Sequence, residues 1–79
     1  MNSTAARLTT CFATVFPELP EAEIPQATIS NVARWDSVAT VTLLSLVGEE
    51  FNIEVDFDRF EELTSFQGLL HYVEERTSA

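Results

Sequence analysis

The stretch that decides the fold is residues 33–51, ARWDSVATVTLLSLVGEEF. Apolar residues recur there every three or four positions, which is the spacing of one face of an α-helix. Asp36 precedes the apolar run and is a favoured N-cap residue, so the sequence predicts a helix over about 37–51. We expect this helix to bury a wide apolar stripe, made of Val38, Val41, Leu43, Leu44, Val47 and Phe51.

A first helix is predicted over about residues 3–16. Asn2 or Ser3 can cap its start, and Pro17 ends it because proline cannot continue a helix. The spacing of its apolar residues predicts one buried face. That face consists of Leu8, Phe12, Val15 and Phe16.

Between these helices, residues 17–35 contain all three prolines of the chain and no sustained hydrophobic period. The segment is therefore predicted to be a long connection. Loops of this length are uncommon in small domains, so we expect it to pack across the helices. The apolar residues available to hold it there are Ile24, Ile29 and Val32.

The C-terminal part of the chain predicts two more helical segments. A short one covers about residues 57–62. Thr64 and Gln67 have the spacing of a capping box, which predicts the start of a last helix over about 65–75. The inward residues of the two segments are expected to be Phe57, Phe60, Leu63, Phe66, Leu69, Leu70 and Val73.

The sequence therefore predicts an all-α fold with three main helices, a short one and a long loop, in a single domain of residues 1–79. The formal net charge is −9, from thirteen acidic residues against four arginines. This charge repels nucleic-acid phosphates, so we expect no nucleic-acid partner, and it favours proteins with a basic surface. No apolar run reaches the roughly 18 residues of a membrane helix, so no membrane span is expected.

Several side chains that often carry chemistry have a structural explanation here. Cys11 is the single cysteine and lies on or beside the apolar face of the first helix, so we interpret it as a buried structural thiol. A single cysteine also excludes an internal disulfide, which fits a reducing, cytoplasmic setting. We expect the protein to be a monomer. His71 has no supporting motif and is assigned no role.

The segment DFDRFEE, residues 56–62, begins like a calcium-binding loop. The comparison fails at Phe60, which replaces an oxygen ligand, and at Glu61, where such a loop needs glycine. We therefore predict no metal site. The acidic residues over 49–62 are consistent both with a solvated surface and with a docking surface for basic partners.

Ser37 raises the main functional question. It follows the predicted cap Asp36, so its hydroxyl should lie near unpaired backbone N–H groups and the positive end of the helix dipole. That position suits a phosphate ester attached by another enzyme, because the chain offers no evident base or metal of its own. An isolated Asp-Ser pair is by itself explained by an ordinary helix start, so the case for function depends on its context.

Residues 35–73 resemble discrete (type II) acyl carrier proteins of the phosphopantetheine-attachment family. The Asp-Ser-Leu motif of that family appears as Asp-Ser-Val at residues 36–38. The family's EEF-x-I-E pattern has its counterpart at residues 49–54, and its I-T-T-V turn has its counterpart at 63–66. The predicted first helix and the proline-containing loop also fit the family's layout.

The resemblance implies a four-helix bundle that is not itself an enzyme. Ser37 would receive a 4′-phosphopantetheine arm from coenzyme A through a magnesium-dependent phosphopantetheinyl transferase, and the thiol of the arm would hold an acyl group as a thioester. Implied partners are an acyl-ACP synthetase or ligase, a ketosynthase or an acyltransferase of a fatty-acid, polyketide or other specialised pathway. Residues that could line a cavity for the acyl chain are Val38, Val41, Leu44, Val47, Phe51 and Phe60.

In this family the second helix contacts the partners and usually presents acidic residues. Here the early exposed positions are neutral, Gly48 replaces an acid, and the pattern remains only at Glu49 and Glu50, which points to a specialised pathway. Trp35 is explained equally well as a partner contact or as an apolar cover of the helix start. The candidate docking residues are Trp35, Val38, Ala39, Thr42, Ser45, Glu49, Glu50, Asp58 and Glu61.

Three alternatives remain open at this point. A discrete aminoacyl or peptidyl carrier would use the same serine, although residues 33–37 lack the glycines that peptidyl carriers place before it, which favours acyl cargo. A non-carrier acidic interaction domain would use Ser37 only to start a helix. Ser37 could also be a phosphorylation site.

Overall fold

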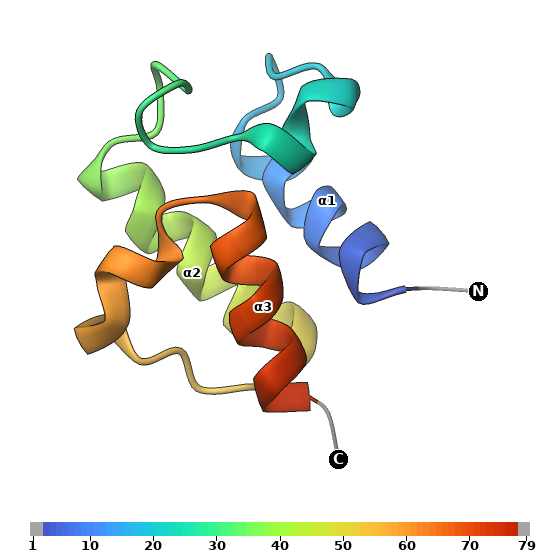
Figure 1. Cartoon of the computed structure of the whole chain (residues 1–79), viewed down its shortest axis with the longest axis vertical. Helices are drawn as coiled ribbons and strands as arrows, with labels where there is room; N and C mark the ends of the chain where they lie inside the picture. Colours follow the sequence, from blue (N-terminus) through green and yellow to red (C-terminus); the bar gives the residue numbers. More distant parts are fainter. Residues whose placement is uncertain (1–2, 78–79) are drawn as a thin grey trace.

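The computed structural model describes residues 3–77, except for the side chains of Phe57 and Phe60. Over this range the all-α prediction is confirmed, with one isolated bridge between Thr28 and Ser65 and no strand. As Figure 1 shows, α1 crosses the molecule beside the other helices, and contacts join it to α2, α3 and η1. The elements are α1 (Thr4–Val15), η1 (Glu21–Gln26), α2 (Ser37–Phe51), η2 (Phe57–Leu63) and α3 (Phe66–Thr77).

The first two helices begin at the caps expected from the sequence. The Ser3 hydroxyl accepts the backbone N–H of Ala6 at 3.0 Å, and Oδ1 of Asp36 accepts that of Ala39 at 2.8 Å. Each bond satisfies an N–H that the helix itself leaves without a partner. Asn2, the other cap considered for α1, lies outside the described residues.

The predicted capping box of α3 is wrong. Ser65, not Thr64, accepts the backbone N–H of Gly68, at 2.9 Å. The Thr64 hydroxyl instead donates back into η2, and the side-chain amide of Gln67 donates to the carbonyl of Pro25 at 3.0 Å. The start of α3 is displaced by one residue because the long loop pairs with it.

The long loop packs across the helices, as predicted, and contains the 3₁₀ helix η1, which the prolines concealed in the sequence. Two backbone bonds of 2.9 Å join it to the start of α3. In one, Ile29 donates to Thr64, and in the other, Phe66 donates to Ala27. The residues expected to hold the loop are buried or half-buried, namely Ile24, Val32 and Ile29.

The centre of the core is an aromatic cluster. Phe12 lies edge-on to Trp35, with 5.4 Å between ring centroids, and edge-on to Phe66 at 5.1 Å. Phe16 packs at 5.6 Å from Trp35. These contacts join α1, the end of the long loop and α3, so the chain just before α2 is held by the core.

The apolar stripe predicted for α2 is wrong at its N-terminal end. Val38 and Val41 are 74% and 52% exposed, whereas Thr40 is completely buried. The physical reason is that Thr40 shares one helical face with the leucines that follow it, and the buried indole of Trp35 satisfies its hydroxyl, since Nε1 donates to it at 2.8 Å. The buried face is Thr40, Leu43, Leu44, Val47 and Phe51.

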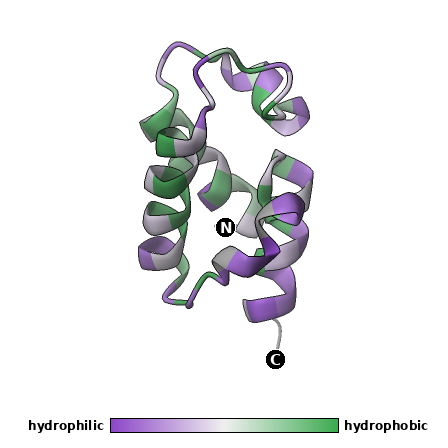
Figure 2. Cartoon of the chain, turned by 90° about the vertical axis from the view of Figure 1, so that its left-hand side faces the viewer, coloured by the Kyte–Doolittle hydropathy of each residue, from purple (hydrophilic) through white to green (hydrophobic). Residues whose placement is uncertain are grey.

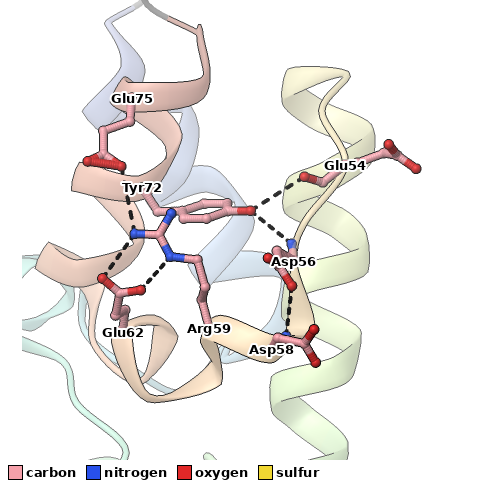
Figure 3. Close-up of polar contacts among 7 residues, drawn as sticks. All are labelled: Glu54, Asp56, Asp58, Arg59, Glu62, Tyr72 and Glu75. Atoms are coloured by element: carbon pink, nitrogen blue, oxygen red, sulfur yellow. Dashed lines mark hydrogen bonds and ion pairs between the residues drawn. The ribbon is translucent and has the colours of Figure 1, made fainter.

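A polar cluster fastens η2 and the preceding loop to α3 (Figure 3). The Tyr72 hydroxyl accepts the backbone N–H of Asp56 at 2.8 Å, and the Arg59 guanidinium lies over the Tyr72 ring at 5.1 Å. Arg59 also pairs with Glu62 and, at 3.8 Å, with Glu75. The hydrogen bond from Arg59 lowers the pKa of the Glu62 carboxyl.

Throughout residues 3–77, every helix is too short or too polar to cross a bilayer.

Candidate functional site

Ser37 is the first residue of α2, and its side chain is exposed. The turn around it is held on both sides. Asp36 donates its backbone N–H to the carbonyl of Arg34 at 3.1 Å, and its own carbonyl accepts the N–H of Thr40 at 2.9 Å. A group attached to the Ser37 hydroxyl would therefore project into solvent from a rigid support.

The support beneath this turn is Trp35. Its side chain is only 2% exposed and reaches Thr40 below Ser37, so it anchors the chain on both sides of the serine. This burial supports its alternative role as a cover of the helix start and leaves little of its side chain for a partner to contact. Thr40 was missed in the sequence, although a polar residue inside an apolar run could have drawn attention to it.

The surroundings of Ser37 suit a phosphate ester. The N–H groups of Ser37 and Val38 lie in the first turn, where an α-helix has no internal acceptor for them, and the helix dipole places partial positive charge there. The Asp36 carboxylate accepts the backbone N–H of Ala39, and the side chain of Ser37 is exposed to solvent. The residues present thus fit a phosphate-linked group on Ser37, with backbone N–H groups next to its negative charge.

An uncharged surface lies next to Ser37 on α2. We call it the Ser37 patch and define it as Val38, Ala39, Val41, Thr42 and Ser45. Ala39 is half-buried and the other four residues are exposed. An open groove of about 930 Å³ runs along this surface and is bounded on its other side by the end of α1, including Val15 and Phe16.

The acidic docking candidates differ in how free their charges are. Glu49 is exposed near the end of α2, and Asp58 and Glu61 are exposed in η2. Glu50 is paired, since Nε of Arg7 lies 2.9 Å from its Oε2. The charge that the sequence retains on the second helix is therefore partly neutralised by α1.

Gly48, where the family usually has an acid, has a packing role. A Cβ at this position would lie 3.1 Å from the carbonyl oxygen of Ile53, which belongs to the loop that folds back on α2. The Ile53 N–H donates to the Gly48 carbonyl at 3.0 Å. Glycine at this position leaves room for that close approach.

The predicted cavity residues do not form one group. Leu44, Val47 and Phe51 are buried in the core, whereas Val38 and Val41 lie on the surface. The side chain of Phe60 lies outside the described part of the structure. The structure thus divides the set into core residues and residues of the Ser37 patch.

The other reactive side chains lie away from Ser37. Cys11 is buried in α1, and burial raises the pKa of its thiol to about 11, with a further increase from the negative charge of Glu50. A protonated, covered thiol is a poor nucleophile. His71 is exposed on α3. Over residues 3–77, the histidine, cysteine and acidic side chains form no cluster suited to a metal ion.

The fold and the site define a small helical protein that offers one exposed serine at a rigid helix start. Comparison with known proteins agrees with this class. The family model described as "Phosphopantetheine attachment site" matches residues 6–73. An acyl carrier protein from Thermosynechococcus vestitus is 28% identical over 60 residues, which are 76% of this chain and 74% of the relative. The chain therefore belongs to the phosphopantetheine-attachment family and is a non-catalytic carrier.

Proposed function

We propose that this chain is a discrete acyl carrier protein and that Ser37 is its attachment residue. The observation that supports this most is the exposed Ser37 hydroxyl at the start of α2, within the span matched by the family model. When bound, the 4′-phosphopantetheine group supplies a thiol that holds an acyl chain as a thioester. The chain itself supplies the acceptor hydroxyl and a rigid, positively polarised helix end.

The partners follow from this role. A phosphopantetheinyl transferase with Mg²⁺ and coenzyme A modifies Ser37, and an acyl-ACP synthetase or ligase, a ketosynthase or an acyltransferase then uses the loaded form. We favour acyl over aminoacyl cargo because the similar protein from Thermosynechococcus vestitus is named an acyl carrier protein and because residues 33–37 lack glycine. The pathway is a fatty-acid, polyketide or other specialised one, and we propose that the carrier acts as a cytoplasmic monomer.

The core residues Leu44, Val47 and Phe51 are our candidates for contact with the acyl chain. An open pocket of about 470 Å³ lies over Leu44, between the end of α2 and the loop that carries Ile53 and Val55. Entry there would require this loop to move away from α2. A domain of this size buries a thin core, so such local opening has a modest free-energy cost.

Mass spectrometry tests the attachment. The unmodified protein is incubated with coenzyme A, Mg²⁺ and several broad-specificity phosphopantetheinyl transferases, and wild type is expected to gain the mass of one phosphopantetheine. Ser37→Ala should gain none, whereas Ser45→Ala, which alters another exposed serine of α2, should be modified like wild type.

Two results would refute the proposal. A wild-type chain that stays unmodified with every transferase would favour the acidic interaction domain. Modification of Ser37→Ala would place the arm on another residue. A smaller added mass, that of a phosphate, on protein from native cells would instead identify Ser37 as a phosphorylation site.

A further inference from the structure

The two valines of the Ser37 patch are unusual for this surface. Among the side chains that the structure describes, Val38 and Val41 are the exposed large hydrophobic residues. Figure 2 shows α2 at the left of the view as a largely hydrophobic helix, with hydrophilic residues at its lower end. Both valines lie within the first two turns after Ser37.

Neither core packing nor helix formation explains these residues. Their exposure means that they contribute little to the core. β-Branched residues also form helices less readily than alanine, glutamate or lysine, because the preceding turn restricts their side chains. An apolar surface beside the one residue that other enzymes must reach is better explained by contact with those enzymes.

The charges around the patch are few or already paired. Arg34 pairs with Glu18 at 2.7 Å, and Glu50 pairs with Arg7. Two exposed acids that form no ion pair with the described residues line the same groove. Asp36 precedes Ser37, with its carboxylate capping α2, and Glu49 lies about three turns from Ser37. Most of the negative charge of the second half of the chain lies on the loop after α2, on η2 and on α3, at Glu54, Asp56, Asp58, Glu61, Glu62, Glu74 and Glu75.

We propose that the phosphopantetheinyl transferase that modifies Ser37 docks on the Ser37 patch through an apolar surface of its own, without lysine or arginine pairing along α2. The inference rests on the proposed function. Val41 lies only about 6 Å along the helix from Ser37, so any enzyme that closes over the Ser37 hydroxyl also covers both valines. Along the groove a basic surface would meet the carboxylates of Asp36 and Glu49, whereas most of the negative charge would draw it toward η2 and α3.

Ionic strength gives the first test. The kcat/KM for modification of wild type is measured from about 0.05 M to about 0.5 M NaCl, a range over which the screening length falls severalfold. Apolar docking predicts a change of less than about 2-fold, whereas steering by charge predicts a fall of about 10-fold or more. The mass assay runs in parallel, so each point reports modification of Ser37 directly.

Matched substitutions give the second test. Val38→Thr and Val41→Thr keep the side-chain shape and should each lower kcat/KM about 10-fold, because each puts a hydroxyl where a methyl group would be buried against the enzyme. Thr42→Val replaces a hydroxyl with a methyl group inside the patch and should raise kcat/KM. Thr10→Val makes the same change on the exposed surface of α1, outside the patch, and should leave it unchanged. Circular dichroism confirms that each variant is folded.

The outcomes separate the inference from the function beneath it. A wild-type chain that is never modified overturns both. A chain that is modified at Ser37 but loses kcat/KM steeply with salt, or that tolerates both valine substitutions, remains a carrier and overturns only the apolar docking. If both valine substitutions are tolerated, the exposed valines would have a role only after modification, such as contact with the acyl cargo, which is absent during this assay.

Discussion

The buried hydrogen bond between Trp35 and Thr40, next to the turn that contains Ser37, can be tested by the substitution Thr40→Val. Valine has nearly the shape of threonine, so the change removes one hydroxyl and leaves the packing intact. That hydroxyl accepts from Nε1 of Trp35 and donates to the carbonyl of Asp36, each at 2.8 Å. The Asp36 carbonyl keeps its bond from the Thr40 N–H, whereas the buried indole N–H has no other partner in the described structure.

The magnitude follows from that orphaned donor. Leaving a buried polar group without a partner costs about 1–3 kcal/mol, whereas valine recovers only part of this through its extra methyl group. A domain of this size changes its melting temperature by about 4–8 °C for each kcal/mol. We therefore expect Thr40→Val to lower the free energy of unfolding by about 1–2 kcal/mol and the melting temperature by roughly 4–16 °C.

Thr42→Val is the matched control for this prediction. Thr42 lies on the same helix, and its hydroxyl makes the same type of bond, to the carbonyl of Val38 at 3.1 Å, but it is exposed. Its replacement should change stability by less than about 0.5 kcal/mol. Urea denaturation followed by circular dichroism measures both variants. If Thr40→Val proves as stable as Thr42→Val, the indole bond does not hold the start of α2 and the reasoning is wrong.

Two further predictions concern the helical glycines and the buried thiol. Gly68→Ala should destabilise the fold by about 1–3 kcal/mol, because its methyl group would overlap the carbonyl oxygen of Glu62. Gly48→Ala should be within about 0.5 kcal/mol of neutral, because its 3.1 Å contact with the Ile53 carbonyl oxygen offsets the gain in helix propensity. Equal denaturation midpoints for the two variants would contradict this prediction. Because the pKa of Cys11 is raised to about 11, its thiolate should be about 100-fold scarcer at pH 8 than that of an ordinary thiol, so alkylation should be slow until denaturant is added. Rapid alkylation of the folded protein at pH 8 would show that Cys11 is accessible. The raised pKa also means that the contribution of the Cys11 thiol to stability is complete below pH 9.0 and is lost as the pH rises toward about 11.

The starts of α1 and α2 were predictable from the sequence, because a helix cap depends only on residues within one turn. Ser3 and Asp36 cap their helices because each side chain needs only a backbone N–H three residues away. Ser37 was identified in the same way, since its position follows from the cap and the apolar run. The resemblance to carrier proteins added the chemistry, which the family comparison supports.

The cap of α3 and the helix within the long loop depend on contacts between distant segments of the chain. Ser65 caps α3 in place of Thr64 because the loop from α1 to α2 forms backbone bonds with Thr64 and Phe66. The 3₁₀ helix within that loop depends on burial of Ile24 against α1 and α3, which no local pattern reveals.

The sequence alone determined that the chain forms helices and that Ser37 directly follows a helix cap, because caps, prolines and apolar spacing act over a few neighbouring residues. Only the tertiary structure decided which face of α2 meets the solvent. Trp35 enters the aromatic core and binds Thr40, and this rotation buries a threonine and exposes Val38 and Val41 beside Ser37. The apolar residues alone favoured the two valines over Thr40 for the core, because the sequence does not show that the Thr40 hydroxyl finds a hydrogen-bond partner there.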